Sequence, residues 1–161
     1  LERMLHVRTR KMPLSALCFS ARIDWSAVSG SVEAELEATL DRARKLNRLN
    51  GVTGALLLSS DSIVCWLEGN SRGLADTRDC VGRDSRLSDI TEIAQGEISE
   101  RVFSRCWLYF ADLRRSGTAD GTPIDTASLA SSPDIAAAAR IIAPLTERLA
   151  PARQTQRAML V

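Results

Sequence analysis

The stretch Asn47–Gly69 constrains the fold most, because it contains a helix end, two strands and the turn between them. Asn50-Gly51 supplies the positive-φ backbone that commonly ends a helix. Residues 52–58 are an apolar run of strand length, and residues 59–62, Ser-Ser-Asp-Ser, are typical of a turn. Residues 63–67 form a second apolar run. This order predicts a helix followed directly by a β-hairpin.

The chain before and after this stretch adds further elements. Residues 14–20 read as a first strand, which precedes the helix. The helix is expected to begin near Ser31, and its apolar stripe consists of Val32, Leu36, Leu40, Ala43 and Leu46. The hairpin is expected to end at Glu68-Gly69-Asn70, and a weaker helix lies between Gly73 and Gly82.

Two more strands are predicted after the second helix, over residues 89–94 and 106–110. Alternation along the last strand places Cys106, Leu108 and Phe110 on one face and Trp107 and Tyr109 on the other. The resulting order is strand, helix, strand, strand, helix, strand, strand. It predicts an α+β fold, a ferredoxin-like sandwich whose mixed five-stranded sheet carries two helices on one face.

The two ends of the chain differ from this central domain. Residues 1–12 are expected to be an N-terminal extension, residues 13–113 the domain, and residues 114–161 a loop followed by a C-terminal helical cap. Residues 114–128 are rich in Gly, Thr, Asp and Ser, and Ser132-Pro133-Asp134 is a good helix start. An apolar stripe follows, made of Ile135, Ala138, Ile141, Ile142, Leu145 and Leu149 and interrupted at Pro144. We expect it to cover the other sheet face, to which Trp66, Trp107 and Tyr109 should point.

Composition excludes several classes of function. The net charge of +1 and the few aromatic residues argue against nucleic-acid binding. The only histidine, His6, lies in the extension, which excludes a histidine-rich metal site or a His-dependent triad in the core. No apolar run is long enough to span a membrane, and the N-terminus lacks a signal-type core, so a cytoplasmic protein is expected. The four cysteines are widely spaced and read as reduced thiols.

The run Val52-Thr53-Gly54-Ala55-Leu56, followed by Trp66-Leu67-Glu68-Gly69, resembles the signature of the BLUF family of flavin-binding blue-light sensors. The resemblance spans roughly Leu14 to Leu113. It implies a flavin, usually FAD, between the two helices with its ring against the sheet. In this family a tyrosine on the first strand and a glutamine on the third bond to each other and to the flavin. Light moves an electron and a proton across that network and reorders the glutamine.

Several family features carry over to this chain. Asn47 stands where the family places the asparagine that bonds the isoalloxazine edge. Asp84-Ser85-Arg86 resembles the family's Asp-x-Arg-His, which contacts ring or phosphate groups. Arg101-Val102-Phe103 resembles the Arg-x-Phe before the last strand. The resemblance therefore implies that the flavin site is retained in part.

The photochemical residues do not carry over. The tyrosine position falls on Phe19, which has no O–H, and the glutamine position falls on Cys65, which has no amide. The sensing tryptophan and methionine positions are Cys106 and Leu108. Leu87 replaces the histidine after Arg86, and Ala43 replaces the usual serine. The residues expected to line a flavin site are Asn47, Arg86, Asp84, Phe19, Cys65, Ile63, Cys106 and Leu108.

These departures predict a divergent sensory or regulatory domain without ordinary blue-light photochemistry. FAD binding stays open, since the cleft could hold the flavin or be filled by Phe19 and Leu87. The domain is expected to act on an unknown protein partner through its sheet face or C-terminal helices, with self-association implied by the resemblance. Asn47 has an alternative interpretation as a helix cap, and Asp84 with Arg86 as a solvated loop pair.

Two alternative functions remain. One is an FAD-binding light or redox sensor that uses Cys65 or Cys106, which are expected to share the flavin-facing side of the sheet. Two small core hydrophobes are the preferred interpretation of these thiols, because no His or Lys lies nearby in sequence to lower their pKa. The other alternative is a small cysteine hydrolase on a ferredoxin-like scaffold. Few acid–base residues near the expected pocket support it.

Overall fold

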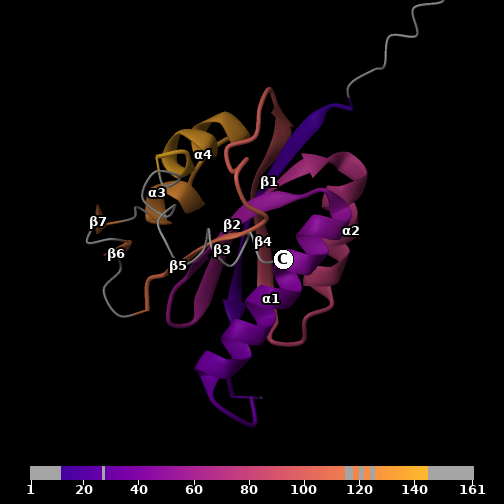
Figure 1. The fold of residues 1–161 in the computed structure, drawn as a ribbon. Helices are drawn as coiled ribbons and strands as arrows, with labels where there is room; N and C mark the ends of the chain where they lie inside the picture. The colour runs from indigo at the N-terminus through magenta and orange to yellow at the C-terminus, as the bar shows by residue number, and fades with distance from the viewer. Residues whose placement is uncertain (1–11, 27, 115–117, 120–121, 124–125, 145–161) are drawn as a thin grey trace, which may run out of the picture.

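The computed structural model describes residues 12–26, 28–114, 118–119, 122–123 and 126–144. Figure 1 shows one twisted sheet with α1 (Val32–Asn50) and α2 (Ser71–Gly82) on one side and α4 (Ile135–Ile142) on the other. The sheet contains β1 (Leu14–Ile23), β2 (Thr53–Leu58), β3 (Ser62–Asn70), β4 (Leu87–Ile98) and β5 (Tyr109–Asp112) in the order β4-β1-β3-β2-β5. Only β2 and β5 pair in parallel. The predicted α+β sandwich with a mixed five-stranded sheet is confirmed.

The long helix begins and ends where its capping residues predict. The Ser31 side chain accepts a hydrogen bond from the Ala34 N–H at the start of α1. At the other end Gly51 adopts φ 64°, and its N–H donates to main-chain carbonyls of the last turn. The hairpin then follows at once, with the Ser59 N–H donating to the Ser62 carbonyl over 2.8 Å.

Several strands are longer than predicted. Strand β3 runs on through Gly69 to Asn70, because both residues still pair with the start of β1, at Ser15 and Leu14. Strand β4 covers 87–98, since it pairs with β1 along most of that strand, with register shifts near Phe19 and Arg22. The β4 prediction therefore missed residues at both ends, where Ser88 and Glu97 interrupt the apolar pattern.

Each face of the sheet carries its own core. On the sheet face that α1 and α2 cover, the buried apolar residues are Leu17, Phe19, Ala21, Leu36, Leu40, Val52, Leu58, Ile63, Cys65, Leu67, Leu74 and Leu108. On the α4 face they include Ala16, Cys18, Ala55, Leu57, Trp66, Phe103, Cys106, Tyr109, Ala111, Leu129, Ala138 and Ile142. Trp66 and Tyr109 thus lie on the predicted face. Trp107 is only half-buried and belongs to neither cluster.

The predicted face of Cys106 is wrong. Cys106 packs in the α4-side core with Trp66 and Tyr109, whereas Cys65 packs in the α1/α2-side core with Phe19. Strand β5 begins only at Tyr109, so the backbone before it is not in the ladder. The alternation of side chains between the two sheet faces therefore does not hold at Cys106. Cys65 and Cys106 lie on opposite faces and not, as expected, on the same one.

The C-terminal segment contains more structure than a loop and one helix start. Part of the predicted 114–128 loop forms β6 (Thr118–Ala119), β7 (Thr122–Pro123) and the start of the short helix α3 (Thr126–Ala130). Helix α4 begins after Asp134, whose side chain accepts from the Ala137 N–H, and it buries Ala138 and Ile142. Leu145, Leu149 and residues 1–11 lie outside the described part of the chain. None of the described helices is long and apolar enough to cross a membrane.

Candidate functional site

A cavity of about 340 Å³ lies between α1, α2 and the sheet. Its walls are mostly apolar, with Leu36, Ala43 and Leu46 from α1 and Leu56 and Leu58 from β2. All of the candidate site residues except Cys106 line it, namely Phe19, Asn47, Ile63, Cys65, Asp84, Arg86 and Leu108. Sequence positions far apart are thus brought to one cavity, and Cys106 is excluded from it because it belongs to the opposite face.

Phe19 and Cys65 stand directly opposite each other in the floor of the cavity. The antiparallel register of β1 and β3 pairs Phe19 with Cys65, and both side chains are buried. Cross-strand neighbours of this kind have Cβ atoms about 5 Å apart. Burial raises the pKa of the Cys65 thiol well above its usual range, and the nearby Cys18 raises it further. The pair therefore consists of a phenyl ring and a protonated thiol.

Asp84 and Arg86 close one side of the cavity. The Arg86 guanidinium donates to both carboxylate oxygens of Asp84, over 2.9 and 2.6 Å, and also to Glu35 over 2.9 Å and Thr39 over 2.7 Å on α1. Hydrogen bonding from Arg86 holds the pKa of the Asp84 carboxyl below its usual value. This pair is therefore more than a solvated loop pair, because it ties the turn after α2 to α1.

Asn47 joins the cavity to the segment before β5. Its side-chain Nδ2 donates to the Trp107 carbonyl over 2.8 Å, while its main-chain carbonyl accepts from the Val52 N–H over 2.8 Å. The side-chain amide thus bonds to the segment before β5, while the main-chain carbonyl takes part in the C-terminal cap of α1, since it also accepts from the Gly51 N–H. The residue therefore holds the chain at Trp107 against the C-terminal half of α1.

Trp25 is a cavity residue that the sequence analysis missed. It lies in the loop between β1 and α1 and lines the cavity near Ile23. Its indole Nε1 is buried and has no hydrogen-bond partner. A tryptophan among polar loop residues was the available signal, since this side chain combines an apolar body with a polar N–H. Thr39, the acceptor for Arg86 on α1, was missed as well.

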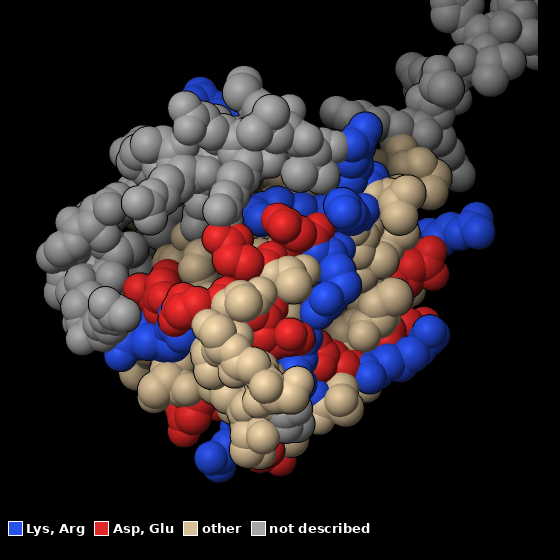
Figure 2. Space-filling view, turned by 60° about the horizontal axis from the view of Figure 1, so that its bottom comes forward, with Lys and Arg blue, Asp and Glu red and all other residues tan. Residues whose placement is uncertain are grey.

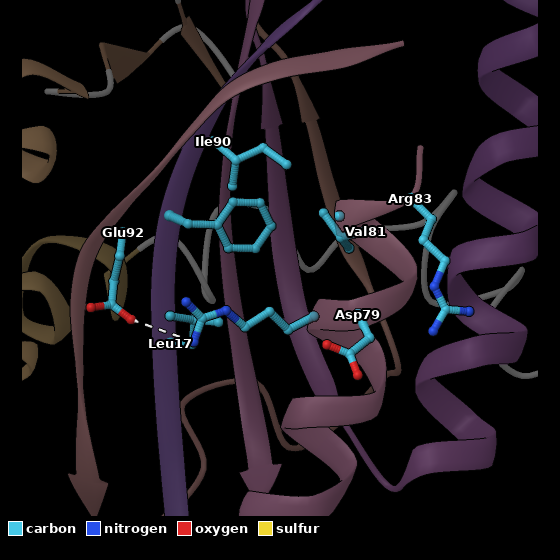
Figure 3. Close-up of a pocket in the computed structure, with 9 residues that line it drawn as sticks. Leu17, Asp79, Val81, Arg83, Ile90 and Glu92 are labelled. Atoms are coloured by element: carbon cyan, nitrogen blue, oxygen red, sulfur yellow. Dashed lines mark ion pairs between the residues drawn. The ribbon is translucent and has the colours of Figure 1, made fainter. Parts of the chain in front are cut away.

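A second cavity of about 440 Å³ opens between α2 and the edge strand β4 (Figure 3). Leu17, Val81 and Ile90 supply apolar walls, and Arg78 pairs with Glu92 over 3.8 Å between exposed side chains. Phe19 and Val81 line both cavities and so form part of the wall between them. On the molecular face that Figure 2 shows, acidic and basic side chains are interspersed.

Comparison with known protein families identifies the family to which this chain belongs. The family model BLUF, described as sensors of blue-light using FAD, matches residues 17–108. The chain belongs to the BLUF family. The match covers β1 from Leu17 onward, β2, β3 and both helices of the cavity. No sequence among the curated proteins is detectably similar to this chain.

Solved structures of BLUF proteins share the fold. The dark-state structure of the BLUF protein BlrB is similar with a TM-score of 0.68 and 20% identity, over 83% of this chain and 97% of that one. BlsA in its photo-activated state gives 0.58 and 22%, over 65% and 72% of the two chains. BlrP1 of Klebsiella pneumoniae with FMN and cyclic diGMP gives 0.57 and 24%, over 63% of this chain and 26% of that one. At these identities the likeness concerns the fold.

The cavity fits a flavin ring in some respects and not in others. Its volume of about 340 Å³ lies within the range of small-molecule sites. Its apolar walls suit a flat aromatic ring, and the unpartnered indole N–H of Trp25 suits an acceptor on the edge of that ring. Phe19 and Cys65 do not supply the hydroxyl and amide that the family's light reaction uses. The cavity thus combines apolar walls with a phenyl ring and a thiol in its floor.

Proposed function

We propose that this chain is a divergent BLUF-type sensory or regulatory domain that holds FAD in the α1/α2 cavity without the family's ordinary photochemistry. The observation that carries the proposal is the direct pairing of Phe19 with Cys65 in the cavity floor. These are the positions at which the family places its tyrosine and glutamine. A bound flavin would meet an apolar floor there.

The chemistry of the two side chains accounts for the lost reaction. FAD, when bound, supplies blue-light absorption and an excited-state electron acceptor. Phe19 has no proton to give, and Cys65 has neither the amide donor nor the amide acceptor that a reordering glutamine needs. The raised pKa of Cys65 keeps its thiol neutral, which also argues against thiol redox chemistry at this site. Asn47, Asp84 and Arg86 line the same cavity and would hold polar parts of the ligand.

The output is proposed to pass through contact with a partner protein. Helix α4 covers part of the face opposite the cavity and leaves Ala136 and Arg140 exposed to a partner. A light-regulated bacterial adenylyl cyclase shares this fold over 65% of our chain and 30% of its own, so in that protein the fold is part of a larger regulated chain. This supports a regulatory role, with self-association as a further proposed mode of contact.

The test is to restore the missing pair. Phe19→Tyr and Cys65→Gln are made singly and together, and each protein is loaded with FAD, desalted and illuminated with blue light. We expect bound flavin in every variant and a reversible light-induced shift of the flavin absorption only in the double variant. The two single variants are the matched controls, because each restores half of the pair. A shift in the unaltered chain, or a double variant that binds flavin without any shift, would contradict the proposal.

A further inference from the structure

Trp25 is held in a fixed position at one end of the α1/α2 cavity. The preceding residue, Asp24, donates its N–H to the Arg86 carbonyl over 2.8 Å and accepts from the Ser26 N–H over 2.8 Å. The Trp25 carbonyl accepts from the Val28 N–H over 3.1 Å. These bonds fix the backbone on both sides of the indole. The side chain therefore lines the cavity from a backbone that these bonds hold in place.

The indole N–H of Trp25 is a buried donor without an acceptor. Most buried polar groups in proteins are hydrogen-bonded, so each exception calls for an explanation. Trp66 provides the contrast within this chain, because its indole N–H donates to Glu68 Oε2 over 3.1 Å. One indole is thus satisfied inside the protein, and the other is satisfied only if something else supplies the acceptor.

Asp84 and Thr39, two polar residues that share the cavity with Trp25, already have partners. Both carboxylate oxygens of Asp84 accept from Arg86. Thr39 Oγ1 accepts from Arg86 and from Arg42, and donates to the Glu35 carbonyl. These acceptors are therefore committed to a network that ties α1 to the turn after α2. The missing acceptor is best supplied by a molecule in the cavity.

We propose that Trp25 is a ligand-contact residue whose indole N–H donates to an acceptor oxygen of the bound flavin. This inference rests on the proposed function, since it takes the cavity to be the flavin site. The acceptor belongs either to a ring carbonyl or to a phosphate of the cofactor, both of which accept hydrogen bonds. Because no protein group accepts from this N–H, binding adds a hydrogen bond without breaking one within the protein.

The affinity arm compares Trp25→Phe with the unaltered chain in titrations with FAD and with riboflavin, which lacks the phosphates. We expect Trp25→Phe to weaken binding about tenfold, the loss that corresponds to one buried hydrogen bond. An equal loss for riboflavin places the acceptor on the flavin part that both molecules share, and a loss seen only with FAD places it on the part that riboflavin lacks, the phosphates and the adenosine. Trp107→Phe is the matched control, because Trp107 does not line the cavity, and it should bind as the unaltered chain does.

The spectroscopic arm follows the indole N–H signals of the ¹⁵N-labelled protein. On addition of FAD the Trp25 signal should shift and become protected from exchange with water, whereas the Trp66 signal, already bonded to Glu68, should stay in place. Flavin binding with an unchanged Trp25 signal, or with equal affinity in Trp25→Phe, would overturn the inference and leave the proposed function intact. Failure of the unaltered chain to bind either flavin would overturn both. Unfolding midpoints of the free proteins confirm that each variant is folded.

Discussion

The two faces of the sheet are built from the same strands but are packed differently. On the α4 side the core contains Trp66 and Phe103, both fully buried, and even the carboxylate of Glu68 is completely satisfied. On the α1/α2 side the strands leave a cavity of about 340 Å³ and an indole donor without a partner. The comparison teaches that the α4 face is packed throughout, whereas the α1/α2 face combines a buried core with a cavity.

Glu68 is the centre of a hydrogen-bond network on the α4 side of the sheet. Its carboxylate accepts from Thr53 Oγ1 over 2.9 Å, from Trp66 Nε1 over 3.1 Å, and from the N–H groups of Val102 over 2.8 Å and Phe103 over 2.6 Å. Arg101 adds bonds to Thr53 Oγ1 and to the main chain at Gly51 and Glu68. The signature residues Trp66 and Glu68 therefore join β3, β2 and the segment before β5 on the face opposite the cavity, whereas Leu67 between them lines the cavity.

Glu68→Ala should produce the largest loss of stability. It leaves several buried donors unpaired, and each costs about 1–3 kcal/mol. We expect the free energy of unfolding to fall by about 3–5 kcal/mol in urea denaturation. Glu100→Ala is the matched control, because Glu100 is exposed, and it should change little. Similar losses of unfolding free energy for the two variants would contradict the stabilising role of Glu68 on the α4 side.

Truncation of one leucine on each face sharpens the comparison. Leu57 is buried to 1% exposure in the filled core, whereas Leu36 lines the cavity. Leu57→Ala should cost about 3–4 kcal/mol of unfolding free energy, because it creates a new void in a packed core. Leu36→Ala should cost less, about 1–2 kcal/mol, since its side chain already borders empty space. Equal costs in urea denaturation would show that the cavity side is packed as tightly as the other.

The smallest effect is expected from Asp84→Asn and depends on pH. The lowered pKa of Asp84 in the folded chain means that its ionised form stabilises the fold. That contribution is complete above the unfolded pKa, about 4, and is lost as the pH falls through the lower folded value. Asp84→Asn should therefore lower the free energy of unfolding at pH 6 by less than about 1 kcal/mol in urea denaturation, given solvent screening. The difference should narrow toward pH 3, and a constant difference would contradict the role of this carboxylate.

Local signals in the sequence predicted the main elements well. Ser31 and Asn50-Gly51 marked the ends of α1, and the turn residues 59–62 marked the hairpin, because capping and turn chemistry act over a few residues. The family resemblance identified positions that meet in one cavity. Local patterns could not place Cys106, because its face depends on where the chain enters the ladder at Tyr109.

The remaining errors also come from tertiary context. The full length of β4 follows from its pairing with β1 rather than from its own composition. The start of helix α3 lies within the predicted 114–128 loop, because the polar residues before it and its own Thr126 and Ser128 are typical of a loop. Trp25 was missed because a loop residue shows no periodicity, and the lack of a partner for its indole becomes visible only in three dimensions.

The most direct test of the central claim is the absorbance spectrum of the purified chain. The protein is incubated with excess FAD, desalted, and recorded before and after blue illumination. A retained flavin band that light does not shift is the predicted result, since the cavity is present and the proton-exchanging pair is absent. Loss of the flavin on desalting would contradict the assignment of the cavity, and a reversible light-induced shift would contradict the proposed loss of photochemistry.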